Sequence, residues 1–252
     1  MRTREMSRMT WVEVKEAIDQ NYGVILPIGS TEQHGYHLPI STDAIIATTL
    51  SLEVTDESNM LVAPPITYGY RSRPLSGGGQ AFAGTTSLSG KTLMLLVEDI
   101  LEEFVRQGFR RIALLSWHME NQNFIYESAY IVSQRHPDIK IIVMESPFDK
   151  LSDETMELVF GGDFPGWARE HAAIQETSMM LYRYPELVLF DRAVNDRTEE
   201  YPFYEVLPIQ KHYYPVSGSL WKAREASAQK GERVWKEIVE IAKQALKKEL
   251  PV

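Results

Sequence analysis

The sequence contains no cysteine, and this absence limits both its cross-links and its metal chemistry. Without cysteine the chain forms no disulfide, which is usual for proteins of a reducing compartment, and we therefore expect a cytoplasmic protein. Any metal site has to use nitrogen and oxygen ligands from histidine, aspartate and glutamate.

Long apolar runs and an excess of basic residues are also missing. No segment approaches the roughly 18 apolar residues that a membrane-spanning helix needs, and residues 1–10 contain no apolar signal core. The 26 Lys and Arg against 35 Asp and Glu give a formal net charge of -9. This balance disfavours nucleic acid and anionic membranes as partners, because both reward clustered positive charge. A small-molecule partner is the remaining expectation.

The 252 residues include no linker rich in Ser, Gly or Pro, which predicts one domain spanning residues 1–252. Apolar runs alternate with amphipathic segments of helical period. Strands are predicted at 24–28, 60–63, 112–115 and 139–144. Helices are predicted at 11–20, with Trp11 on the buried face, at 43–54, from Ser89 to 107, at 166–182 and at 223–250. A further helix follows residue 121 and ends near 135, and a short one begins at 152 or 153. This alternation predicts an α/β protein with a mainly parallel central sheet and helices on both faces, in which ligands bind at the carboxyl ends of the strands.

Carboxylate and imidazole side chains follow two of these strands, 24–28 and 112–115. Because neighbouring parallel strands end at one edge of a sheet, we expect these side chains to lie close together. Five such ligands suggest two metals, which would polarise a carbonyl and acidify a water for hydrolysis. Asp43, at a helix start, is the best candidate for a ligand shared by the two metals. The alternative is that these residues only cap surface loops. The set is Glu32, His34, Asp43, His118 and Glu120.

Three motifs resemble those of the creatininase (creatinine amidohydrolase) family. Residues 32–39 (EQHGYHLP) with Asp43 are similar to its first metal motif, 118–121 (HMEN) to its second and 170–178 (EHAAIQETS) to its third. Further similarity at 68–70 (YGY), 76–79 (SGGG) and 84–88 (GTTSL) extends the resemblance over nearly the whole chain. It implies hydrolysis of a non-peptide amide, a hexamer and two divalent cations: zinc at one site and zinc, manganese or magnesium at the other.

The resemblance also implies roles for individual residues. Glu32, Asp43 and His118 would hold one metal; His34, Asp43 and Glu120 would hold the other. Ser76, Met119 and Trp167 fall at substrate-contacting positions, and His171 falls at the proton-transferring histidine. Glu176 would support a ligand or join the acid–base network, and Glu120 is also a candidate to take a proton from water.

The substrate pocket follows the family only in part. Met119 stands where creatininase has a substrate-contacting Tyr, Pro147 stands at the position of a pocket Trp, and Ala168 stands at that of an acidic residue. The sequence therefore predicts a hydrolase of creatinine or a similar small cyclic amide. Another amide, such as a formamide or a peptide-derived cofactor precursor, is the alternative, and a metal-stabilised binding protein without activity is a third.

Overall fold

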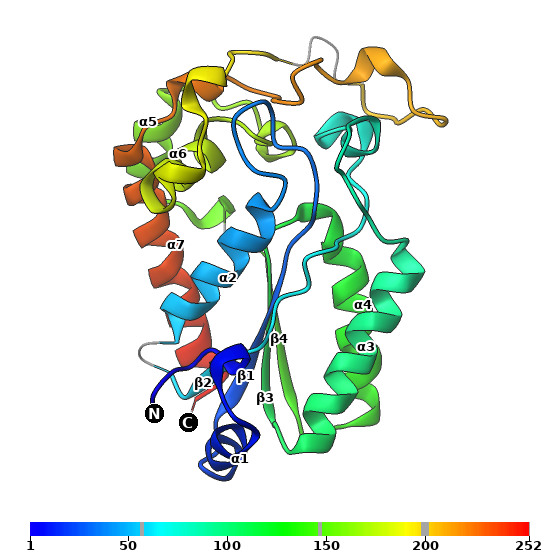
Figure 1. Cartoon of the computed structure of the whole chain (residues 1–252), viewed down its shortest axis with the longest axis vertical. Helices are drawn as coiled ribbons and strands as arrows, with labels where there is room; N and C mark the ends of the chain where they lie inside the picture. Colours follow the sequence, from blue (N-terminus) through cyan, green and yellow to red (C-terminus); the bar gives the residue numbers. More distant parts are fainter. Residues whose placement is uncertain (56–57, 146–147, 198–201, 252) are drawn as a thin grey trace.

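Four parallel strands form the centre of the computed structural model, which describes residues 1–55, 58–145, 148–197 and 202–251 (Figure 1). The strand order is β2 (Met60–Val62), β1 (Gly23–Ile28), β3 (Arg111–Ser116) and β4 (Lys140–Met144). In the register of β1 and β3, Val24 pairs with Ile112 and Ile28 with Ser116, so the two strands end level. This arrangement confirms the predicted α/β class and parallel sheet.

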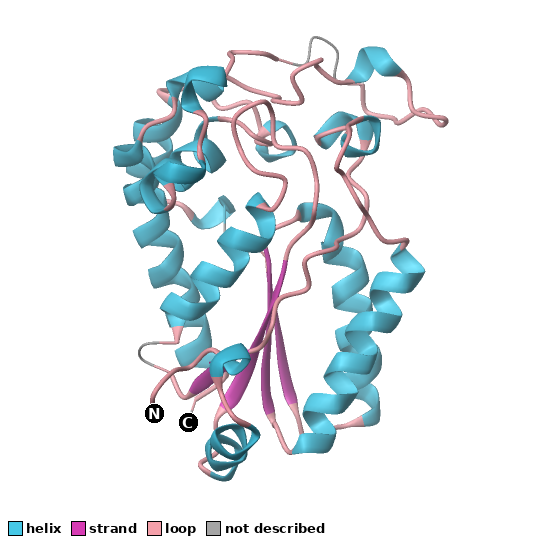
Figure 2. Ribbon diagram, viewed as in Figure 1, coloured by secondary structure: helices cyan, strands magenta, loops and turns pink. Residues whose placement is uncertain are grey.

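Successive side chains of β1 face opposite sides of the sheet, which gives the sheet two apolar faces. Ile25 belongs to one buried cluster, whereas Val24 and Leu26 belong to the other. Figure 2 shows helices on both sides of the strands. The first cluster includes residues of α2 (Thr42–Val54), α5 (Asp153–Phe160), α6 (Ile174–Arg183) and α7 (Ala228–Glu249); the second includes residues of α1 (Trp11–Asp19), α3 (Gly90–Gln107) and α4 (Gln122–Arg135).

Local signals explain several helix ends. Thr10 and Glu13 form a capping box at the start of α1, and the Ser89 hydroxyl accepts a hydrogen bond from Thr92 N at the start of α3. Gly108 ends α3 with a φ of 110°, a conformation that favours glycine. One prediction for α1 is wrong: Trp11 is 80% exposed, and Ala17 is the buried residue of this helix.

Two further helix predictions need correction. Residues 166–182 do not form one helix; a short 3-10 turn at Trp167–Arg169 is followed by an irregular stretch, and α6 begins only at Ile174. Ala172 has a φ of 49°, which interrupts any helix there. The last helix begins at Ala228 with Ser227 as its cap, because residues 223–225 form a separate 3-10 turn.

Long connections gather at the carboxyl ends of the strands, and the two chain termini lie at the opposite end of the molecule (Figure 1). The described part of residues 184–215 contains short 3-10 turns and an isolated β-bridge of Arg197 with Trp221, in agreement with the missing period in its sequence. Among the helices that the structure describes, none is both long enough and apolar enough to cross a membrane.

Candidate metal centre

The site lies where β1 and β3 end. The loop after β1 carries Glu32 and His34, α2 begins one residue before Asp43, and the turn after β3 carries His118. Since Ile28 and Ser116 are paired neighbours, the segments that follow them leave the same edge of the sheet. The sheet register therefore brings together side chains more than 80 positions apart.

Glu32, Asp43 and His118 form a first group whose potential ligand atoms lie within 4.8 Å of one another. His118 Nδ1 is 3.1 Å from Glu32 Oε1 and 3.3 Å from Asp43 Oδ2. His118 Nε2 donates a hydrogen bond of 2.8 Å to the carbonyl oxygen of Tyr70. Because a carbonyl only accepts, Nε2 carries the hydrogen, and Nδ1 of the neutral ring directs its lone pair at the two carboxylates.

His34, Asp43 and Glu176 form a second group with the same spacing of ligand atoms. His34 Nε2 lies 3.1 Å from Asp43 Oδ1 and 3.8 Å from Glu176 Oε2. The other ring nitrogen, Nδ1, donates to the carbonyl oxygen of Glu32 at 3.1 Å, so Nε2 of the neutral ring faces carboxylates with its lone pair. Asp43 belongs to both groups, one oxygen toward each imidazole.

These groups fit divalent cations. Neither Glu32 nor Asp43 is more than 2% exposed, yet Glu32 Oε2 and Asp43 Oδ2 accept no hydrogen bond. Lone pairs of imidazole and carboxylate repel one another unless a proton or a cation lies between them. Nitrogen and oxygen donors of this kind suit zinc and manganese.

The pKa values of the side chains in these groups also indicate a cation site. Burial lowers the pKa of His34, but the charge and hydrogen bond of Asp43 outweigh it and raise the pKa to about 10. Burial also opposes ionisation of Asp43, yet the neighbouring imidazoles His34 and His118 hold its pKa below the ordinary value. Protons thus lie between these lone pairs. Cations would occupy the same positions at lower electrostatic cost.

Glu120 lies on the outer side of His118 and belongs to none of the groups among the described residues. Its Oε2 is 3.6 Å from His118 Nε2, and its Oε1 accepts hydrogen bonds from the Ser76 hydroxyl and, at 3.4 Å, from Arg73 N. The family resemblance implies Glu120 as the ligand beside His34, whereas in this structure Glu176 forms a group with His34 and Asp43. Glu176 is held by Ala172 N, which donates to Oε2 at 2.7 Å, and by Trp117 Nε1, which donates to Oε1 at 3.2 Å.

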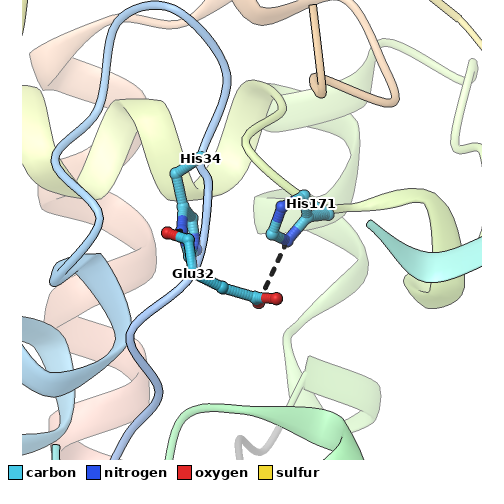
Figure 3. Close-up of side chains that lie close together, drawn as sticks. All are labelled: Glu32, His34 and His171. Atoms are coloured by element: carbon cyan, nitrogen blue, oxygen red, sulfur yellow. Dashed lines mark hydrogen bonds and ion pairs between the residues drawn. The ribbon is translucent and has the colours of Figure 1, made fainter. Parts of the chain in front are cut away.

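His171 lies beside the first group but in an irregular stretch rather than on a helix. Its Nδ1 is 3.7 Å from Glu32 Oε1, and its ring packs 4.5 Å from the ring of His34 (Figure 3). The positive φ of Ala172 lets His171 and Glu176 face the same space from a short segment. His37, from the same loop as His34, turns away and contacts Thr177 Oγ1 at 2.7 Å.

The predicted site residues share one small cavity of about 30 Å³, which they line with the exception of His34. A larger cavity of about 690 Å³ adjoins it, and Ser76, Met119, Glu120 and Ala168 line both. The Trp167 ring packs 4.5 Å from that of Phe164 at the inner cavity. Pro147 lies outside the described residues.

Sequence reasoning missed two features of the site. The contact of Glu176 with His34 had no sequence signal, because it depends on the non-helical backbone before α6. The role of Gln33 was also missed. The signal for it in the sequence is a polar residue placed between the two proposed ligands Glu32 and His34.

A parallel α/β sheet that presents buried carboxylates and imidazoles at its strand ends has the fold and site of a metal-dependent hydrolase. The family model for creatinine amidohydrolase matches residues 7–246, and the chain belongs to the creatininase family. It is therefore an enzyme that hydrolyses amide C–N bonds with the help of metal.

Relatives and solved structures agree with this assignment. The creatinine amidohydrolase of Pseudomonas putida is 36% identical over 98% of this chain and 97% of its own length. A mycofactocin precursor peptide peptidase of Mycolicibacterium smegmatis is 30% identical over 86% of this chain and 81% of its own. A manganese creatininase and a mutant creatininase of Zn-Zn type superpose with TM-scores of 0.95 and 0.96, each at 33% identity with full coverage of both chains.

Proposed function

We propose that this chain is a binuclear metal amidohydrolase that opens creatinine or a similar small cyclic amide. The observation that carries the proposal is Asp43, whose two carboxylate oxygens face His34 in one group and His118 in the other. A shared carboxylate between two buried ligand sets is the arrangement that two adjacent cations need. The Pseudomonas putida relative, named for action on creatinine, supports the narrow substrate assignment.

The proposed ligands are Glu32, Asp43 and His118 for one cation and His34, Asp43 and Glu176 for the other. We propose zinc at one site and zinc, manganese or magnesium at the other, because imidazole favours zinc and carboxylate suits all three. When bound, the two cations would polarise the amide carbonyl and make water a better nucleophile.

The remaining side chains would move protons and hold the substrate. Glu120 has one oxygen near His118 and the other bonded to Ser76, so it faces the cavity and is placed to take a proton from water. His171, which lines the same small cavity, would deliver a proton to the departing nitrogen. Ser76, Met119 and Trp167 would contact the substrate.

The test is hydrolysis by the metal-replete protein of creatinine and of a panel of cyclic ureides, lactams and formamides, with and without chelator. We expect creatinine turnover that disappears with chelator and in His118→Ala. Hydrolysis elsewhere in the panel without creatinine turnover would contradict the substrate and keep the amidohydrolase. Tight metal binding with no hydrolysis of any amide would favour the binding protein instead.

A second candidate is hydrolysis of a larger amide. The outer cavity of about 690 Å³ extends from the small cavity along Arg73, Tyr204 and Glu205, and is far larger than a creatinine ring needs. The mycobacterial relative named as a precursor peptide peptidase supports this alternative. Met119 and Ala168, which depart from the creatininase pattern, lie at the junction of the two cavities.

We also propose a homo-oligomer, a hexamer by resemblance. Large apolar side chains are exposed on α3 and α4, among them Leu95 at 52%, Tyr126 at 59% and Tyr130 at 51%. Faces of this kind are often covered in oligomers. Light scattering on the purified protein measures the mass directly, and a monomer would contradict the proposal.

A further inference from the structure

Gln33 lies between the proposed ligands Glu32 and His34, and the hydrogen-bond partners of its side chain lie outside the two ligand groups. It is 5% exposed, and its side chain connects three separate segments. Oε1 accepts a hydrogen bond of 2.8 Å from Gly35 N, and Nε2 donates to the carbonyl oxygens of Gly77 at 2.8 Å and Gly218 at 2.9 Å. Since the donor Gly35 N requires oxygen and the two carbonyls require NH₂, these partners fix the orientation of the amide.

The backbone oxygen of Gln33 determines which nitrogen of His171 carries the hydrogen. His171 Nε2 is 2.9 Å from the backbone oxygen of Gln33 and 2.9 Å from its Nε2. The two amide hydrogens are already directed at Gly77 O and Gly218 O, so neither remains for the imidazole. The backbone oxygen only accepts, and His171 Nε2 must therefore carry the hydrogen that bonds to it. In the neutral ring, Nδ1 then carries the lone pair and faces Glu32 across 3.7 Å.

Two glycines allow the flanking loops to close on this pair. A Cβ on Gly218 would lie 1.9 Å from Gln33 Oε1, and a Cβ on Gly77 would lie 3.3 Å from the His171 ring. Both glycines also have positive φ, 78° and 150°. The loop of Gly77 also carries Ser76, whose hydroxyl bonds Glu120. Gln33 therefore joins the segment of Ser76 to the ring of His171.

We propose that Gln33 is a positioning residue for hydrolysis: its backbone holds His171 as the Nε2–H tautomer, and its side-chain amide fixes the Ser76 loop against that ring. The proposal rests on the proposed function, because it assumes that His171 transfers a proton through Nδ1. Removing the amide should loosen His171 and Ser76 and leave the metal ligands in place.

The tautomer is tested on the wild-type zinc-loaded protein by nitrogen NMR with labelled histidine. The His171 resonances are assigned by their loss in His171→Gln. We expect the ring as Nε2–H with an unprotonated Nδ1; finding the Nδ1–H tautomer would overturn the inference. This measurement needs no turnover, so it stands even if the protein hydrolyses no amide of the panel.

The positioning role is tested with Gln33→Met, which keeps the length and removes the hydrogen bonds, and Gln33→Glu, which turns an acceptor toward two carbonyls. We expect kcat to fall by about 100-fold in Gln33→Met, the effect typical of a misplaced catalytic group, and further in Gln33→Glu. Bound metal should remain as in wild type. Gln80→Met, an exposed glutamine near the same loop, is the control and should keep wild-type kcat.

Two outcomes would overturn the positioning role. One is a wild-type kcat in Gln33→Met. The other is loss of metal from Gln33→Met in proportion to the loss of kcat, since Gln33 would then act through the ligands and not through His171. If wild type hydrolyses no amide, the proposed function fails, and the NMR result alone decides how Gln33 holds His171.

Discussion

The inner half of the site, which holds the two ligand groups, is built differently from the outer half, which lines the larger cavity. The inner half, with Asp43 and His34 each 1% exposed, stands on β1, β3, α6 and the start of α2, and hydrogen bonds donated to backbone carbonyl oxygens fix its imidazoles. The outer half consists of short turns, and Met119 there is 48% exposed. A cluster held by sheet register tolerates little change, whereas turns change without disturbing the sheet.

This difference agrees with the departures from the creatininase pattern that the sequence predicts. Met119 and Ala168, two of the departures, line the outer cavity. The residues of the two ligand groups lie in the inner half. We therefore expect the inner half to set the type of reaction and the outer half to set the choice of substrate.

The largest expected effect comes from breaking the inner half at Asp43, the proposed shared ligand. Asp43→Asn keeps the shape but removes the charge that both groups use. We expect turnover to fall by about 1000-fold or more, since metal ions supply several kcal/mol of charge stabilisation. Metal analysis should show fewer than two cations per chain. Asp99→Asn, an exposed aspartate on α3, is the matched control; an Asp43 variant that kept both cations would contradict the shared-ligand assignment.

The boundary between the halves is tested by comparing two glutamates. Glu120→Gln removes a charge from the outer side of His118 and should lower kcat by about 100-fold or more, as expected for a lost general base, with both cations retained. Glu176→Gln removes a charge beside His34 and should lower the number of bound cations as well. Glu120→Gln that lost metal while Glu176→Gln kept it would reverse the assignment of these two residues.

The strand ends that carry the inner half were predictable from sequence, but the place of Glu176 in it and the shape of the outer half were not. Apolar runs followed by Glu32, His34 and His118 revealed strands and their carboxyl ends, and Ser89 and Gly108 marked α3 correctly. The contact of Glu176 with His34 depends on a positive φ at an alanine, which no residue type signals. The exposure of Trp11 and the outer cavity arise from packing between distant segments, which periodicity does not encode.

The imidazole of His37, in the loop after β1, should make folding less favourable in acid. Burial and the nearby His34 lower the pKa of His37 to about 4, while the unfolded chain takes up this proton near pH 6.5. The folded state therefore binds fewer protons than the unfolded state between these values, and stability falls as the pH drops through this window. Between pH 7.5 and 5.0 the loss from His37 should be about 2 kcal/mol. Denaturant titrations of wild type and His37→Asn measure it; equal losses in both proteins would contradict the assignment.

The smallest effect is expected in the outer half. Arg73 lies 3.6 Å from Glu205 and its side chain is 60% exposed, so it faces water as much as substrate. If the outer cavity accepts larger amides, Arg73→Gln should lower kcat/KM for an N-acyl dipeptide by about fivefold at most, the limit for an exposed ion pair of ~1 kcal/mol.

Creatinine does not reach Arg73 in this proposal, and its kcat/KM should stay at the wild-type value. Arg106→Gln, which removes an exposed arginine paired with Glu103 on α3, should change neither substrate. An equal loss for creatinine and for the dipeptide would show that Arg73 acts on the inner half, through its backbone contact with Glu120, and not on substrate size. The ratio of the two substrates, more than either rate alone, therefore measures how independent the two halves are.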